Sequence, residues 1–215
     1  LCMAAMAPAH GALAANPPAY VADTIADPGR PPGDLAQDGE RKPADVLAFA
    51  GVKPNQVVVD FFARGYYTRL LAKLVGPKGK VYALTPMIVA FPDLEALIAE
   101  NKQRVRDGKP GVVNPVDPLL AIQNIAEYSN VTAMMEMLRQ YGGQFALPEQ
   151  VDAVVMADGY RALHGKDFGT EATVPGIDKQ IFAALKNGGT FTVSDVMPSA
   201  ADKDSAKAEI LAAGF

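Results

Sequence analysis

Four residues with side chains or backbone suited to a small-molecule site follow two apolar runs. Asp60 and Gly65 come directly after a run of three valines, and Asp158 and His164 come after a second apolar run. A carboxylate at a strand end can bind polar ligand groups, and a histidine can exchange protons near neutral pH. Simpler roles remain open at each position: a strand-end cap for Asp60, a tight turn at Gly65, a helix cap for Asp158 and a solvated His164.

The stretch from Gln56 to Tyr82 is expected to position the first pair. Its valine run predicts a buried strand that ends near Asp60, and the turn with Gly65 leads into a helix. That helix should bury a leucine face and stop at Gly76, before a second strand at 80–84. A strand, helix and strand over so short a stretch form a βαβ unit, which begins a parallel sheet. Ligands of such sheets bind beyond the carboxyl ends of the strands, so a site is expected around Asp60 to Gly65.

Further elements repeat this alternation along the chain. The patterns predict helices at 44–50, 93–107, 119–128, 176–187 and 203–213, and strands at 131–137, 151–157 and 190–195. The segment 131–137 is also compatible with a helix, because it is rich in methionine. The repeated order predicts an α/β fold, a doubly wound and mainly parallel sheet with helices on both faces.

The helix at 176–187 is expected to end at Gly188. Its buried side should carry Ile177, Ile181, Phe182 and Leu185, which recur at helical spacing.

Composition excludes several functional classes. The 215-residue chain is 49% apolar, which suffices for one domain with its own core. A net charge of -4 without a lysine-arginine run argues against nucleic-acid binding. With Cys2 as the only cysteine and only His10 and His164 as histidines, neither a disulfide framework nor a metal site is expected. No G-x-S-x-G turn accompanies His164, which disfavours a serine hydrolase.

The first 43 residues differ from the rest. Residues 1–15 are small and apolar and resemble the end of a secretory signal with its cleavage site, although a mobile alanine-rich tail is the alternative. They are too short to span a membrane, and no transmembrane segment is expected. Residues 16–43 are rich in proline and predict an extended arm, and residues 44–215 form the α/β domain. The signal predicts a periplasmic or secreted protein.

Several stretches resemble one family. VVVDFFARGYYTRLLAKLVGPKGKVYAL is similar to the first motif region of class I S-adenosylmethionine-dependent methyltransferases, a Rossmann-like family. VDAVVMADGYRALH resembles their fourth motif, and FAALKNGGTFTVSD resembles their following helix and fifth strand. The nearest resemblance is to a bacterial group of predicted methyltransferases that often carry signal peptides. The similarity extends over residues 27 to 214.

The resemblance implies a set of cofactor contacts and reveals departures from the pattern. Asp60, Gly65, Thr85 and Asp158 would line S-adenosylmethionine, and His164 would be the catalytic acid or base. Relatives resemble D-x-x-P-G-G-G-Y, whereas this chain keeps one glycine of three and carries Arg64 where a glycine is expected. The bulky Arg64 is expected to enter the cofactor's space. The second strand ends without the carboxylate that holds the ribose, and Thr85 offers a single hydrogen bond instead.

Two functions therefore remain. The eroded motif favours a methyltransferase relative of the cell envelope that has lost catalysis and serves as a binding or structural subunit, with protein partners in an envelope complex. The alternative is an active enzyme that methylates a small or envelope substrate. The chain also ends where the family's terminal β-hairpin would begin, so either the sequence is a fragment or the sheet lacks that hairpin.

Overall fold

A computed structural model describes residues 16–86, 117–136, 145–163 and 173–195 of the chain. Segment 1–15, the helices expected at 93–107 and 203–213, and His164 lie outside these ranges, as does any terminal hairpin beyond residue 195. No helix within the described ranges is long and apolar enough to cross a membrane.

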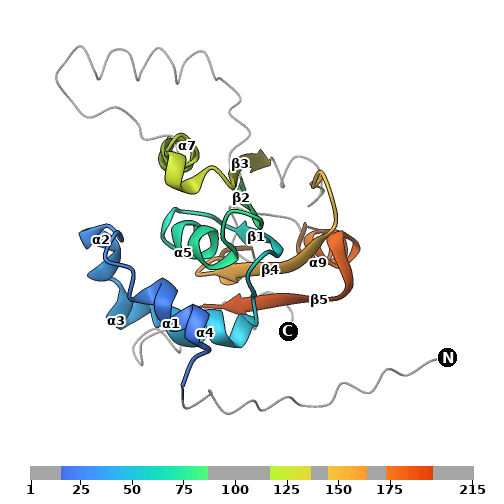
Figure 1. Cartoon of the computed structure of the whole chain (residues 1–215). Helices are drawn as coiled ribbons and strands as arrows, with labels where there is room; N and C mark the ends of the chain where they lie inside the picture. Colours follow the sequence, from blue (N-terminus) through green and yellow to red (C-terminus); the bar gives the residue numbers. More distant parts are fainter. Residues whose placement is uncertain (1–15, 87–116, 137–144, 164–172, 196–215) are drawn as a thin grey trace, which may run out of the picture.

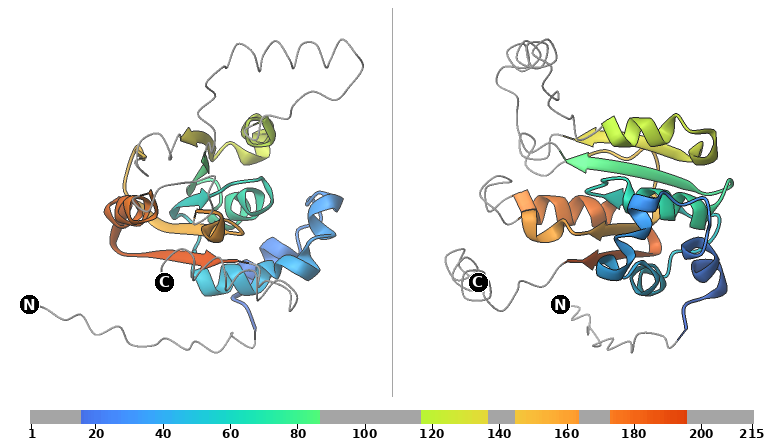
Figure 2. Two further views of the ribbon diagram at one scale, coloured as in Figure 1. Left: turned by 180° about the vertical axis from the view of Figure 1, so that it is seen from behind. Right: turned by 90° about the vertical axis from the view of Figure 1, so that its left-hand side faces the viewer.

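Five parallel strands form the sheet. Their order is β3-β2-β1-β4-β5, and their arrows point the same way in Figure 2. This order confirms the doubly wound, mainly parallel, Rossmann-like α/β fold that the sequence predicts. The strands are β1 (Val57–Phe61), β2 (Lys80–Pro86), β3 (Val131–Glu136), β4 (Val151–Ala157) and β5 (Leu185–Ser194).

Helices cover both faces of this sheet, as expected. Figure 1 shows α5 (Tyr66–Val75) and α7 (Asp117–Gln123) on one face and α9 (Thr173–Ala184) on the other. Each face buries its own apolar cluster: Leu47, Leu71 and Val155 lie in the first, on the α5 face, and Phe61 and Ile177 lie in the second. The remaining helices are α1 (Ala19–Ile25), α2 (Pro32–Leu35), α3 (Asp38–Arg41), α4 (Pro43–Ala50), the 3-10 helix η1 (Ala126–Tyr128) and α8 (Tyr160–Leu163).

The βαβ unit forms as the sequence predicts. Helix α5 begins after Gly65, ends before Gly76 and buries Leu70, Leu71 and Leu74. The first residues of α5 therefore follow closely after the end of β1, at the place where the sequence predicts the ligand site.

The prediction of an extended arm at 16–43 is wrong. This segment contains α1, α2 and α3, which lie on the same side of the sheet as α5 in Figure 1. Proline explains the difference, because α2 begins at Pro32 and α1 follows Pro18 directly. A proline at the start of a helix loses no hydrogen bond and has a suitable φ angle, so these prolines begin helices.

Two predictions about the chain around α9 are also wrong. Helix α9 ends at Ala184, and Leu185 already pairs with Val151 of β4 through an irregular register. Gly188, at φ 79°, therefore lies inside a bulged strand instead of ending the helix. Ile177 and Ile181 are buried as expected, but Phe182 is 81% exposed among the described residues. It follows Ile181 directly and points away from the sheet.

Candidate functional site

The strand order reverses between β1 and β4. These two strands are parallel neighbours, but β2 lies beyond β1 on one side and β5 lies beyond β4 on the other. The loops that leave their carboxyl ends therefore diverge, and an open α/β sheet binds its ligands at this point. Asp60 is the fourth residue of β1 and Asp158 follows β4 directly, so the fold places both carboxylates near the carboxyl ends of adjacent strands.

Asp60 is buried inside the domain. Its side chain is 3% exposed and accepts a hydrogen bond of 2.5 Å from the Thr68 hydroxyl on α5. Burial raises the pKa of the Asp60 carboxyl to about 7, and the Thr68 hydrogen bond opposes this shift only in part. In this arrangement Asp60 joins the end of β1 to the first turn of α5.

The Gly65 turn is packed against neighbouring side chains. Gly65 has a φ angle of 100°, which a residue with a side chain adopts only with strain. A Cβ atom placed there would lie 3.0 Å from an Arg69 guanidinium nitrogen and 3.1 Å from Ile122 Cδ1. Arg64 is exposed, and its expected entry into the cofactor's space stays a prediction. Arg69 and Ile122 fill the side of the turn toward which a Gly65 Cβ would point.

Phe62 is the residue that the sequence analysis missed. It lies directly after β1 in the left-handed region, at φ 66°, and its side chain is buried. An added Cβ on Gly159 would lie only 2.6 Å from Phe62 Cγ, so the ring packs against the backbone at the end of β4. The sequence shows an aromatic residue directly after the first strand, but no local pattern indicates that its ring packs against Gly159.

Thr85 lies at the end of β2 and is also buried. Its hydroxyl donates a hydrogen bond of 3.0 Å to the Ala63 carbonyl oxygen, and the Ala63 amide donates to the Leu84 carbonyl oxygen. Thr85 therefore fixes the loop that follows β1 onto the end of β2.

Asp158 contacts the N-terminal helices. It has a φ angle of 59°, and its carboxylate forms an ion pair with Arg41 of α3. Beside this pair lies a cavity of about 480 Å³. Its lining comes from the N-terminal helices and the ends of β4 and β5: Glu40, Arg41, Lys42, Val46, Asp158, Ser194 and Asp195.

His164 lies outside the described residues, so its predicted catalytic role stays a prediction. No group of three or more histidine, cysteine or acidic side chains in the described ranges is arranged to hold a metal ion.

Comparisons with known proteins find similarity in structure only. No known family profile matches the sequence, and no curated protein matches it. Among solved structures, an S-adenosylmethionine-dependent methyltransferase from Aquifex aeolicus is 18% identical with a TM-score of 0.47, over 83% of this chain and 82% of that chain. Precorrin-6y C5,15-methyltransferase from Geobacter metallireducens is 16% identical with a TM-score of 0.39, over 80% and 70%. The glycopeptide N-methyltransferase MtfA in complex with S-adenosylmethionine is 18% identical with a TM-score of 0.37, over 69% of this chain and 50% of that chain.

Proposed function

We propose that this chain is a methyltransferase-fold protein of the cell envelope that has lost catalysis and acts as a binding or structural subunit. The observation that carries the proposal is the packing at the Gly65 turn. Arg69 and Ile122 lie 3.0 and 3.1 Å from the position that a Cβ atom on Gly65 would occupy. This side of the turn therefore has no free space into which a ligand group such as the methionine end of S-adenosylmethionine could enter.

The other expected contacts support the same proposal. The Asp60 carboxyl is engaged with Thr68, and the Thr85 hydroxyl proton is donated to Ala63. Thr85 would have to give up its hydrogen bond to Ala63 before it could donate to a ligand, at a cost of about 1 kcal/mol or more. Asp60 is only 3% exposed, so a ligand could reach it only if its surroundings moved. The signal-like segment 1–15 supports an envelope location, where a cofactor made in the cytoplasm would be scarce.

One observation favours the alternative, an active methyltransferase. The cavity beside Asp158 lies at the carboxyl ends of β4 and β5, and two residues at the strand ends, Phe62 and Asp158, have strained positive φ angles. Backbone strain of this kind concentrates at functional sites.

Titration calorimetry separates the two functions. S-adenosylmethionine and S-adenosylhomocysteine are titrated separately into the full chain, and circular dichroism verifies that the protein is folded. We expect no binding heat up to millimolar ligand, because the Gly65 turn is filled. A micromolar Kd for either compound would overturn the proposal that cofactor binding is lost, and would favour the alternative, an active methyltransferase. The envelope location is tested separately, by osmotic-shock fractionation of cells that express the protein with its native N-terminus.

A further inference from the structure

The segment 27–42, which contains α2 and α3 and is called the strap below, is attached to the domain almost entirely by polar groups. Its only buried residues are Arg30 and Asp34. Leu35, the one large apolar side chain of α2, is 47% exposed. The strap itself therefore contributes little apolar surface to the contact, and the large apolar groups that it covers on α5 are the rings of Tyr66 and Tyr67. Buried apolar surface is the usual barrier to local opening, and here it is small on the strap's side.

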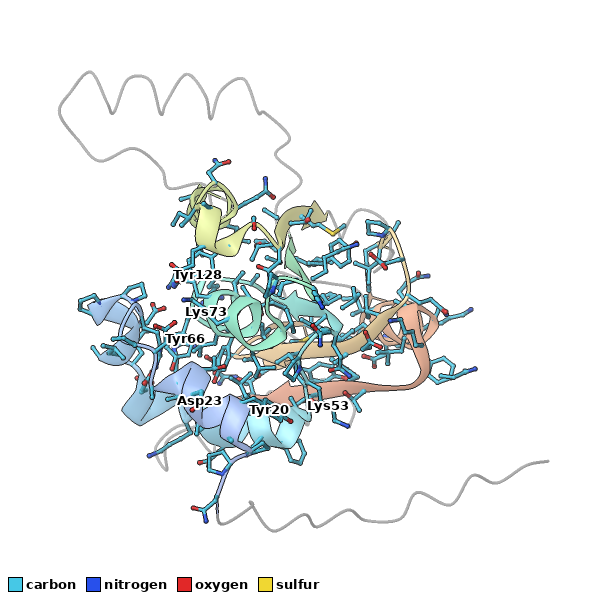
Figure 3. The ribbon with its side chains drawn as sticks, viewed as in Figure 1. Tyr20, Asp23, Lys53, Tyr66, Lys73 and Tyr128 are labelled. Carbon is cyan, nitrogen blue, oxygen red and sulfur yellow. The ribbon has the colours of Figure 1, made fainter. Side chains whose placement is uncertain are left out.

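Ion pairs hold the strap to α5. Arg69 Nε donates a hydrogen bond of 2.6 Å to Asp34, and Lys73 pairs with Asp27 at 2.6 Å. Figure 3 shows Lys73 on the part of α5 that faces the N-terminal helices. Because Arg69 also lies against Gly65, the pair with Asp34 joins the strap directly to the turn at the end of β1.

Two tyrosines and Asp158 complete the attachment. Tyr66, at the start of α5, donates its hydroxyl hydrogen to Asp38 at 2.5 Å, and Tyr67 donates to the Arg41 carbonyl oxygen at 2.8 Å. Arg41 pairs in turn with Asp158 at the end of β4. The strap thus runs from the first turns of α5 to the end of β4, across the point where the strand order reverses.

In the position that the structure shows, which is called closed below, the strap contains an imperfectly paired charge. The Arg30 side chain is 3% exposed and binds Asp38 through both terminal nitrogens, but its Nε has no partner among the described residues. A buried ion pair regains its desolvation cost only when its remaining polar atoms are also satisfied. This defect lowers the net stability of the closed position.

We propose that the strap opens as a unit, while the sheet stays folded, and that its ion pairs decide whether the Gly65 turn and the end of β4 at Asp158 are covered or accessible. Opening separates Asp34 from Arg69 and Arg41 from Asp158. The proposal stands apart from the proposed function, because opening of the strap can be observed without any ligand.

Hydrogen exchange by mass spectrometry on the full wild-type chain is the first test. Raising the salt from about 0.1 M to about 1 M shortens the screening length from roughly 10 Å to about 3 Å and weakens the partly exposed pairs. We expect amides of the strap, such as those of Leu35 and Arg41, to exchange several-fold faster, while amides of β1 and β4 keep their protection. Strap amides that exchange at the rate of the strands at every salt concentration would overturn the proposal.

Asp34→Asn is the second test, because it weakens the pair with Arg69 and nearly keeps the shape of the side chain. Its matched control is Glu149→Gln, which weakens the ion pair with Lys80 at the start of β2. This pair involves no residue of the strap. We expect the strap amides of Asp34→Asn to exchange at least about tenfold faster than those of the wild type. The strap amides of the control should exchange at the wild-type rate. An equal acceleration in the strap and the strands would mean that Asp34 stabilises the whole domain, and the strap proposal would then be wrong. Binding of S-adenosylmethionine by the wild type, by contrast, would overturn only the proposed function.

Discussion

Asp60→Asn should be more stable than the wild-type chain above pH 7, by on the order of 4 kcal/mol, and about equally stable near pH 4. The folded-state pKa of Asp60 is raised to about 7 by burial, whereas an unfolded aspartate titrates near about 3.9. Between these values the native state holds more protons than the unfolded state. The stability linked to this carboxyl is therefore fully present below about pH 4 and is lost as pH rises to about 7. Asparagine stays neutral and can still accept the Thr68 hydrogen bond.

Urea unfolding followed by circular dichroism, at a series of pH values, measures this effect as the difference between the two proteins. Carboxylates with lowered pKa values, such as Asp38 beside Arg30, give the opposite slope but contribute equally to both proteins and cancel. Thr68→Val is the matched variant: it removes the donor that lowers the pKa of Asp60, so the loss of stability should continue to higher pH than in the wild type. A difference that stays constant with pH would show that the Asp60 charge is compensated in the folded protein.

Gly159→Ala should destabilise the domain by about 2–3 kcal/mol, because the new methyl group would overlap the Phe62 ring. The added Cβ would lie 2.6 to 2.8 Å from three Phe62 atoms. The ring is buried and Phe62 already has a strained backbone, so neither can move without cost. Gly33→Ala is the control, since an added Cβ there meets nothing within 4 Å, and we expect a change within about 0.5 kcal/mol.

A double-mutant cycle assigns the effect to the ring. Phe62→Gly alone should lower the free energy of unfolding by about 3–5 kcal/mol, because the burial of the ring is lost. Relief of the backbone strain at this position should reduce that loss by roughly 1 kcal/mol. In that background Gly159→Ala should cost almost nothing, so the coupling free energy should be about as large as the single effect. Additive effects would mean that the backbone, and not the Phe62 ring, resists the added methyl group. If Phe62→Gly also gains affinity for S-adenosylmethionine, the ring is one of the groups that exclude it.

Local pattern determined most of the sheet and its connections. The apolar runs at 57–59 and 151–157 became β1 and β4, and the leucine face with Gly65 and Gly76 at its ends became α5. These features arise from periodicity and turn chemistry within a few residues, which the sequence displays directly. The same information placed Asp60 and Asp158 at strand ends along one edge of a parallel sheet, whereas the pairing of β1 with β4, which makes these ends neighbours, is seen only in the folded chain.

The surroundings of those residues were decided only by tertiary structure. Arg69 and Asp34 are 35 residues apart in the sequence, and Arg41 and Asp158 are 117 apart, so no local pattern marks either pair. The proline-rich segment was expected to be extended because single prolines do not show whether they begin a helix or prevent one. The sequence likewise shows that Arg64 replaces a glycine, but only packing places Arg69 and Ile122 against Gly65 and Phe62 against Gly159. Ion pairs and close contacts depend on three-dimensional proximity, which here only the folded chain supplies.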